Sequence, residues 1–323
     1  EDYYQMAAFF AQMKRKGTGL SPPISGSWEF FYHGPGGAVK HPVTQVVMVP
    51  KPPDGPVAEA MVGGQDPRTS LAEWLTEPKN PFFAKAMVNR VWGELMGRGI
   101  VHPVDDFRAT NPPTNPALLE ALAEDFVFHD FDLKHLLKRI ALSNLYQQSS
   151  KPTDSNLHDT ENFSRSYRRR MSAEVLGDAL ADITQVPDRF EGLPQASKAS
   201  HVWNFKIASD TLDAFGRPDS SSDCPCERNL STSVVQALHL MNSEALQAKL
   251  SHPDGRVKAL VDGDRSEAEI IEELYLLAYH RFPEPVERQI ALAVFNEAET
   301  DRQTATEDLL WALLNSAEFL FNH

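Results

Sequence analysis

Glycine and proline, the two residues that most disrupt helices, are concentrated in one part of this chain. Residues 17–67 hold 18 of its 40 glycines and prolines, whereas the other 272 residues hold 22. Two short runs with strand-like composition, 27–33 and 44–50, lie in this segment between Gly/Pro clusters that are typical of turns. The pattern predicts a small sheet of two or three strands, preceded by a short amphipathic helix over residues 2–14.

Helix-start signals replace the turn signals from residue 66 onward. Ser70 begins a Ser-x-x-Glu capping box, and Asn80 and Asn115 each precede a proline that suits the first position of a helix. Further start signals occur at Asp132, Ser266, Glu284 and Thr304, and the last third of the chain predicts helices at about 233–251, 266–281, 284–299 and 304–321. The predicted fold is mainly α: a multi-helix domain over residues 67–323, with a small N-terminal β element in residues 1–66.

Charge and residue usage exclude several classes of protein. With 31 Lys and Arg against 45 Asp and Glu, the net charge is −14, which argues against nucleic acid as a partner, because phosphate binding needs positive charge. No apolar run approaches the ~18 residues of a membrane span. Two cysteines are too few for a disulfide scaffold or a four-thiolate zinc site. The chain starts at Glu1 without a leader, so we expect a fragment or a processed product.

The segment 81–97 differs from the other predicted helices because apolar residues cover nearly its whole circumference. Such a helix is expected to be central and buried, so its polar residues Asn89, Arg90 and Glu94 need partners. We predict that Arg90 is held in a buried ion pair or hydrogen-bond network with Glu94, Asp105 or Asp106. In an alternative interpretation, Asp105 and Asp106 serve as an acid/base pair for catalysis, and Arg90, Asp105 and Asp106 are candidate ligand-binding residues.

The segment 215–228 combines charged and thiol groups that a plain linker seldom carries together. Its candidate ligand-binding residues are Arg217, Asp219, Glu227 and Arg228, and its candidate metal ligands are Cys224 and Cys226. Three interpretations stay open: an ordered loop whose Arg–carboxylate pairs tie helices together, a binding or catalytic loop for an anionic group, and a metal or redox site at the two thiols.

The histidine pattern gives no metal motif. The 11 histidines include no His-x-x-x-His or His-Glu-x-x-His spacing, which excludes a zincin-like site. His239 lies in an apolar helical stretch, where a core position is the better interpretation. No Gly-x-Ser-x-Gly, Walker or Gly-x-Gly-x-x-Gly motif occurs, so nothing in the sequence supports a Ser/His/Asp hydrolase or a nucleotide site.

A series of short motifs follows in a fixed order along the chain. They are residues 71–75 (LAEWL), 80–84 (NPFFA), 88–92 (VNRVW), 97–101 (GRGIV), 105–107 (DDF), 116–122 (PALLEAL), 132–140 (DLKHLLKRI), 143–146 (SNLY), 169–174 (RRMSAE), 236–242 (QALHLMN) and 310–320 (LWALLNSAEFL). In this order they resemble a planctomycete-specific domain of unknown function, found at the C-terminus of planctomycete cytochrome-C-like proteins. The resemblance covers residues 66–321, and residues 1–15 resemble the tail of the companion domain that precedes it in the same polypeptide.

The resemblance implies an extracytoplasmic protein, periplasmic or secreted, whose partner is the upstream domain of the same polypeptide. It also implies a neighbouring haem-binding domain and enzymes that handle sulfated polysaccharides, but no activity. Covalent haem attachment needs Cys-x-x-Cys-His, and the two cysteines here form Cys-Pro-Cys at 224–226 without a following histidine. We therefore expect no haem cofactor in this chain, and the occupancy of the cysteine pair by a metal stays open.

Three hypotheses about function follow. The first is a secreted, non-catalytic accessory or interaction module that binds its upstream domain or an anionic polysaccharide. The second is a hydrolase acting on sulfated or uronic-acid glycans, using Arg217, Arg228 and nearby carboxylates. The third is a thiol-based metal or redox module at Cys224 and Cys226. The first is favoured because no catalytic motif is present, although whether the chain is an enzyme stays open.

Overall fold

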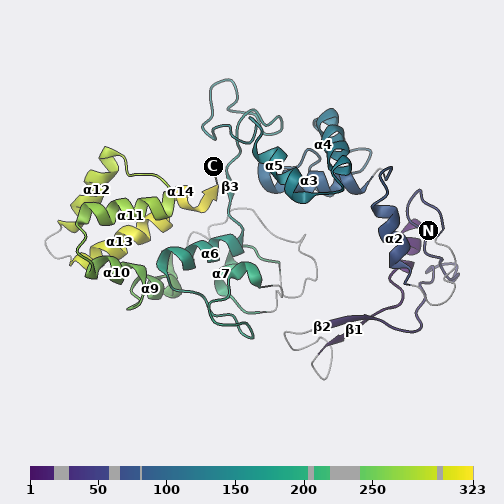
Figure 1. The fold of residues 1–323 in the computed structure, drawn as a ribbon, viewed down its shortest axis with the longest axis horizontal. Coiled ribbons are helices and arrows are strands. Elements are labelled where there is room, and N and C mark those ends of the chain that lie inside the picture. The colour runs from purple at the N-terminus through teal and green to yellow at the C-terminus, as the bar shows by residue number, and fades with distance from the viewer. Residues whose placement is uncertain are drawn as a thin grey trace. The chain divides into compact units, whose positions relative to one another are not determined.

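A computed structural model describes residues 1–17, 29–57, 66–80, 82–202, 207–218, 241–296 and 301–322 of the 323-residue chain. The chain divides into two compact units, Glu1–Tyr167 and Arg168–His323. In Figure 1 the first unit runs from purple to teal and the second from teal-green to yellow. The boundary predicted between residues 66 and 67 falls inside the first unit and stays a prediction.

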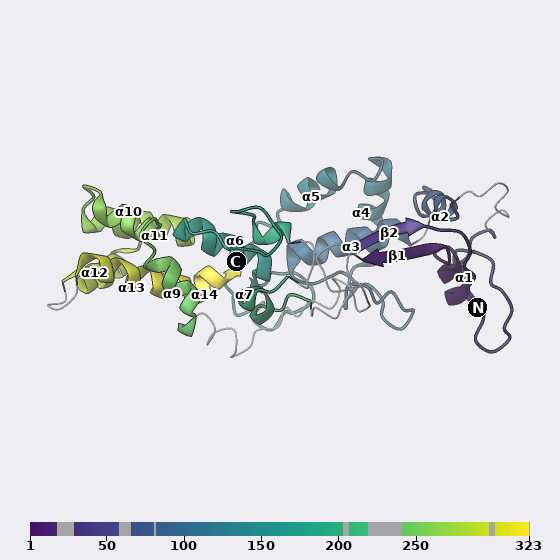
Figure 2. The ribbon, with the colours of Figure 1, turned by 90° about the horizontal axis from the view of Figure 1, so that it is seen from below.

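The first unit starts with a helix and a two-stranded antiparallel sheet. Helix α1 spans Asp2–Ala8, and strands β1 (Met13–Gly17) and β2 (Glu29–His33) pair from Met13 opposite His33 to Gly17 opposite Glu29. The two strands lie side by side in Figure 2. The small N-terminal β element is thereby confirmed.

Two details of this N-terminal prediction are wrong. The helix predicted over residues 2–14 ends at Ala8, and the chain from Met13 pairs with β2 instead. The run 44–50 forms no strand; Val47 makes only an isolated bridge to Lys40. In the first case, strand pairing with a distant segment overrides the local helix propensity of residues 13 and 14.

The described part of the first unit continues with the helices α2 (Arg68–Leu75), α3 (Phe83–Met96), α4 (Pro116–Phe128) and α5 (Leu133–Ala141). The predicted caps of α4 and α5 are confirmed, since Asn115 accepts from the Leu118 amide at 3.1 Å and Asp132 accepts from the Lys134 amide at 2.8 Å. The capping box predicted at Ser70 is wrong, because α2 starts two residues earlier, at Arg68. Asn80 accepts hydrogen bonds from the amides of Phe82 and Phe83, both at 2.9 Å, at the start of α3.

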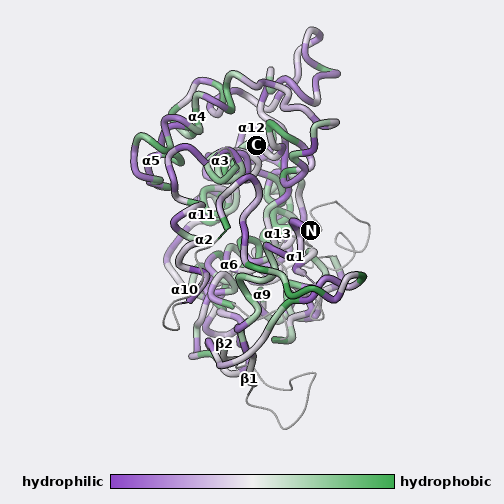
Figure 3. Tube along the Cα trace, turned by 90° about the vertical axis from the view of Figure 1, so that its right-hand side faces the viewer, coloured by the Kyte–Doolittle hydropathy of each residue, from purple (hydrophilic) through white to green (hydrophobic). Residues whose placement is uncertain are grey.

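The core of the first unit lies between α3, α4 and α5. Its buried residues are Ala84, Val88, Trp92, Met96, Ile100, Val101, Leu119, Ala123, Phe126, Leu136, Ile140 and Phe163. Trp92 and Phe163 meet edge to face, with ring centroids 5.4 Å apart. Polar and apolar residues alternate along α4 and α5 in Figure 3, as expected for helices that bury one face and expose the other.

In its described residues, the second unit contains short helices around one core and a small strand pair. The elements are β3 (Arg169–Arg170), α6 (Ala173–Thr184), the 3-10 helix η1 (Ala199–His201), α7 (Asp210–Ala214), α9 (Glu244–Leu250), α10 (Arg256–Asp262), α11 (Glu267–Tyr279), α12 (Pro285–Phe295), α13 (Arg302–Leu314), α14 (Ala317–Leu320) and β4 (Phe321–Asn322). Strands β3 and β4 pair antiparallel, which joins the beginning and the end of this unit. The mainly α fold class is confirmed.

The helix boundaries of the second unit confirm some signals and correct others. The capping box at Ser266 is present, with the Glu269 carboxylate accepting from the Ser266 amide at 2.7 Å, and Glu284 precedes Pro285 at the start of α12. The box predicted at Thr304 is wrong, because Asp301 caps α13 and accepts from the Thr304 amide at 2.9 Å. The helix predicted over 304–321 ends at Leu314 and a new one follows, and only residues 241–251 of the one predicted over 233–251 are described.

An arginine-centred network ties three helices of this unit together. Arg281 makes bidentate contacts with Glu287 (2.7 Å twice) and with Glu318 (2.6 and 2.9 Å). Its guanidinium lies over the rings of Tyr275 and Tyr279, 5.7 and 5.3 Å from their centroids. The network therefore joins the end of α11 to the starts of α12 and α14.

Within the described part of the chain, no helix is both long and apolar enough to cross a bilayer.

Candidate functional site

Arg90 pairs with a predicted partner, but it does so in solvent. Its guanidinium makes a bidentate contact with Asp105, with Nε and Nη2 3.1 and 2.9 Å from the two carboxylate oxygens. Each side chain is 53% exposed, so the predicted burial of this pair is wrong. The apolar residues around α3 are not equally covered: Ala84, Val88, Trp92 and Met96 are buried, while Phe82 before the helix is exposed and Arg90 lies on the open side.

Asp106 does not join Arg90. It pairs with Arg108, with both N–O distances at 2.6 Å, and the hydrogen bonds from Arg108 lower the pKa of the Asp106 carboxyl. A carboxyl group with a lowered pKa is a poor proton donor near neutral pH. Asp105 and Asp106 therefore each have their own arginine, an arrangement that suits loop stabilisation better than acid/base catalysis.

The buried polar residue of α3 is Asn89, whose exposed fraction is 0%. Its amide nitrogen donates to the carbonyl oxygens of Val101 (2.9 Å) and Val104 (2.7 Å), and its amide oxygen accepts from the Val101 N–H (2.9 Å). A Cβ at Gly99 would overlap the Val101 carbonyl and lie 3.0 Å from the Asn89 nitrogen, so the close approach of this loop needs glycine. Asn89 thus holds the loop after α3 against the helix.

Of the loop predicted as a binding site, the structure describes only the beginning. Arg217 is buried and donates from Nε and Nη2 to one Asp213 oxygen at 2.9 and 2.5 Å, while its Nη1 has no hydrogen-bond partner among the residues that the structure describes. Asp219, Cys224, Cys226, Glu227, Arg228 and His239 lie outside the described residues. Binding, metal and redox roles for this loop stay predictions.

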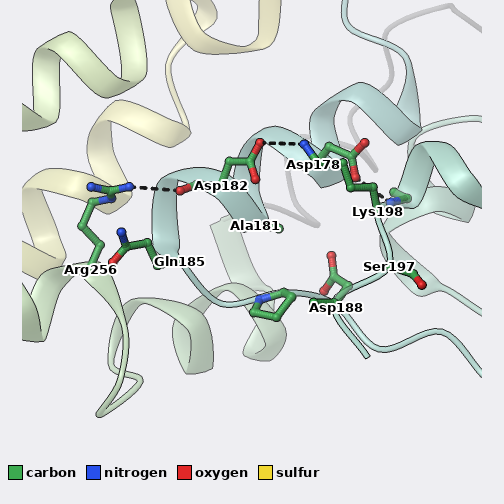
Figure 4. A pocket seen from close by; sticks show the side chains of 11 residues that line it. Asp178, Ala181, Asp182, Gln185, Asp188, Ser197, Lys198 and Arg256 are labelled. Atoms are coloured by element: carbon green, nitrogen blue, oxygen red, sulfur yellow. Dashed lines mark hydrogen bonds and ion pairs between the residues drawn. The ribbon is translucent and has the colours of Figure 1, made fainter. Parts of the chain in front are cut away.

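A pocket that the sequence did not reveal lies in the second unit. Its volume is about 410 Å³, and Figure 4 shows the side chains around it, from the end of α6, from the segment up to η1 and from the start of α10. Its charged lining consists of Asp178, Asp182, Asp188, Lys198 and Arg256. The walls are completed by Ala181, Gln185, Pro187, Ala196, Ser197 and Ala199.

Internal partners hold the acidic residues of this pocket in place. Asp178 accepts hydrogen bonds from the backbone amides of Ala199 (2.5 Å) and Ser200 (3.3 Å), which fixes η1 against α6. The Asp182 carboxylate contacts the Lys198 ammonium at 3.3 Å. Both contacts link α6 to residues 198–200, which form another wall of the pocket.

One basic residue of the pocket, Arg256, bonds the C-terminal end of α6. Arg256 donates to the carbonyl oxygens of Ile183 (2.6 Å) and Asp182 (3.2 Å), the last turn of the helix, as the dashed line in Figure 4 shows for Asp182. Lys249 contacts the Asp188 carboxylate at 2.9 Å and donates to a backbone carbonyl. Cations at a helix C-terminus are favourable because they satisfy its free carbonyl groups.

A sequence signal for this pocket exists but is weak. Asp178 and Asp182 are four residues apart, so they share one face of a helix, as very many solvent-exposed pairs do. Asp188, Lys198 and Arg256 come from three later segments of the chain, and only the folded structure brings them next to the α6 face that carries Asp178 and Asp182. Their separation in the sequence explains why motif analysis missed them.

A protein-family model matches residues 67–295, well over half of the chain. It is PSD1, described as a protein of unknown function (DUF1553). The chain belongs to the PSD1 family. This confirms the resemblance to a domain of unknown function that the ordered motifs indicated. Searches of curated proteins and of solved structures found no match.

The PSD1 match spans parts of both compact units, since the division between them lies after Tyr167. It includes the Asn89 loop contacts in the first unit and every lining residue of the pocket in the second. The family description assigns neither a ligand nor an activity to these residues.

Proposed function

We propose that this PSD1 protein is a non-catalytic accessory module that binds a hydroxyl-rich polysaccharide segment in the pocket of its second unit. The observation that carries the proposal is the pocket itself, whose volume of about 410 Å³ falls within the usual range of small-ligand sites. Its lining is rich in groups that accept or donate hydrogen bonds.

The chemistry of the lining supports a sugar. The carboxylates of Asp178, Asp182 and Asp188 accept hydrogen bonds, whereas the Lys198 ammonium and the Gln185 amide donate them. A sugar hydroxyl does both. Because the amides of Ala199 and Ser200 already position the Asp178 carboxylate, binding would cost that side chain little entropy.

The charge of the lining favours a neutral sugar over a sulfated one at this pocket. Three carboxylates face two cations, and Lys198 and Arg256 are engaged with Asp182 and with the end of α6. A sulfate group would meet uncompensated negative charge. Binding of an anionic polysaccharide through Arg217 and Arg228 stays a separate prediction for the loop at 215–228.

Calorimetric titration with neutral, sulfated and uronic-acid oligosaccharides tests the proposal. Asp182→Asn removes one charged acceptor, so affinity for the neutral ligands should fall roughly tenfold or more, as for a hydrogen bond to a charged group. Asp262→Asn is the matched control, because Asp262 is also exposed and paired with a lysine in the same unit, but does not line the pocket. No binding by wild type, or equal affinity in both variants, would refute the pocket as the site.

The three carboxylates also favour a second candidate function, glycoside hydrolysis, which needs two carboxyl groups in one site. Incubation of the same oligosaccharides with wild type, Asp182→Asn and Asp188→Asn, followed by measurement of new reducing ends, tests it. Reducing ends that wild type releases and both variants fail to release would establish a hydrolase and replace the binding proposal.

We also propose that the module works outside the cytoplasm, beside an upstream domain and a haem-binding domain of the same polypeptide. The resemblance of residues 1–15 to the tail of such an upstream domain supports this setting. Cell fractionation with peptide mass spectrometry of the native protein tests it. Recovery of the peptides in the cytoplasmic fraction alone would contradict it.

A further inference from the structure

The junction of α4 and α5 in the first unit brings two imidazole rings and a carboxylate together. His135 Nε2 lies 2.9 Å from Asp125 Oδ2, and His129 Nδ1 lies 3.5 Å from Asp125 Oδ1. The two rings stack, with centroids 3.7 Å apart. One ring nitrogen from each histidine and one oxygen of Asp125 all lie within 4.8 Å of one another.

Local chain geometry produces this cluster. Asp125 and His129 are four residues apart at the end of α4, so they share one helix face. Asp130 and Phe131 adopt positive φ values of 51° and 58°, which turn the chain back within a few residues. Asp132 then caps α5 and places His135 in its first turn, against Asp125. Figure 1 shows the two helices joined by this short turn.

We propose that Asp125, His129 and His135 form a binding site for a divalent first-row transition ion of the Zn²⁺ type. Two imidazoles and one carboxylate suit zinc, nickel, cobalt or copper, whereas magnesium and calcium prefer sites made of oxygen ligands. Three protein ligands leave the fourth tetrahedral position to water or to a group from a partner. The site shares no residue with the pocket of the second unit.

To hold an ion, the two stacked rings must turn until their nitrogens point at one position, and the ligand atoms are already close together. Metal bonds of 2.0–2.1 Å in tetrahedral geometry place ligand atoms about 3.3 Å apart, and the present atoms already lie within 4.8 Å. The side chains of Asp125, His129 and His135 are 23, 37 and 26% exposed, so an ion can reach them and they can rotate. If His129 binds the ion through Nε2, the 2.9 Å contact of its Nδ1 with the Asp125 backbone carbonyl would orient the ring. If His129 binds through Nδ1, the metal bond replaces that contact.

Arg139 is the cation that competes with a metal here. Its Nε lies 3.8 Å from Asp125 Oδ2, and its side chain is 63% exposed, so it can move away on metal binding. Removing its charge should favour a second cation at the same carboxylate. Arg139→Gln is therefore expected to tighten metal binding, an effect opposite to that of every ligand substitution.

Competition for Zn²⁺ between the full chain and a chromophoric chelator tests the site. His135→Gln and Asp125→Asn should each weaken the tightest binding by at least tenfold, since even the loss of an outer contact to a metal ligand costs about that much. His158→Gln is the matched control, because His158 is an exposed histidine of the same unit outside the cluster. Equal Zn²⁺ binding by wild type and His135→Gln, or an equal loss in the control, would overturn the proposal.

A second measurement uses the unaltered chain and so does not depend on the folding of any variant. Diethyl pyrocarbonate modifies accessible histidines, and mass spectrometry locates the modified residues. Saturating Zn²⁺ should protect His129 and His135 while His158 stays reactive. Modification of His129 and His135 that Zn²⁺ leaves unchanged would exclude them as ligands.

Discussion

Replacement of Asn89 by alanine should be among the most destabilising single changes in the first unit. The substitution removes three hydrogen bonds of 2.7–2.9 Å from a fully buried side chain. At a net value of ~1 kcal/mol each, these bonds contribute about 3 kcal/mol. The Val101 N–H is then left without its acceptor, which adds ~1 kcal/mol or more. We expect a total loss of about 4 kcal/mol in the free energy of unfolding.

The neighbouring residue provides the control. Arg90→Ala removes a bidentate ion pair, but both partners are 53% exposed, and exposed ion pairs contribute at most about 1 kcal/mol. The losses in the free energy of unfolding caused by Asn89→Ala and Arg90→Ala should therefore differ by about 3 kcal/mol, although the two residues are adjacent on one helix.

Urea unfolding read by pulsed hydrogen exchange and mass spectrometry measures this difference locally. Because the chain has two compact units, its unfolding need not be two-state, so the signal is taken from peptides that cover α3 and the loop to Asp106. Asn89→Ala should shift their unfolding to much lower urea, and Arg90→Ala only slightly. A loss for Asn89→Ala that is no larger than that for Arg90→Ala would refute the reasoning.

Two further predictions concern acid stability and haem. Hydrogen bonds from Arg281 lower the pKa of Glu287, so their stabilising effect is complete above the ordinary glutamate pKa of 4.5 and is lost as the pH falls through the lowered value. Glu287→Gln should therefore make the stability of the second unit fall less steeply below about pH 4.5. Trp311 fluorescence, in a variant without other tryptophans, follows the unfolding of this unit. An unchanged pH dependence of stability below about pH 4.5 would contradict the prediction. The isolated chain should carry no covalent haem, and a Soret band that survives acid-acetone extraction of the purified protein would disprove that.

Local signals predicted the helix starts where the capping chemistry is short-range. Asn115, Asp132 and Ser266 bond to amides two or three residues away, so the sequence alone contains both partners. Ser70 fails because Pro67 starts the helix earlier, and Thr304 fails because Asp301 competes for the same role. Capping residues are recognisable from sequence, but the choice between two nearby ones is not.

For the residues of α3, burial was harder to predict than the ion-pair partners. Apolar residues nearly all round α3 indicated a central helix, yet the sequence could not show which side α4 and α5 would cover. That side includes Asn89 and leaves Arg90 exposed. The prediction named Glu94, Asp105 and Asp106 as possible partners of Arg90, and in the structure the partner is Asp105.

The candidate sites depend on contacts that no motif encodes. Asp125 and His135 are ten residues apart and meet only because two residues with positive φ reverse the chain between their helices. Asp182 and Lys198 are 16 residues apart across an irregular segment. Backbone conformation in such segments depends on tertiary contacts, so a search for fixed spacings could find neither site.

The motifs that carry the family resemblance also have a structural explanation. Asn89, Gly99, Val101 and Asp105 all belong to them, and these residues hold the loop after α3 against the helix. Asp178, Asp182, Asp188, Lys198 and Arg256 belong to none of the motifs. Recognition of the PSD1 family therefore predicts a shared scaffold without predicting a shared ligand, and the ligand must be sought by experiments on the pocket residues themselves.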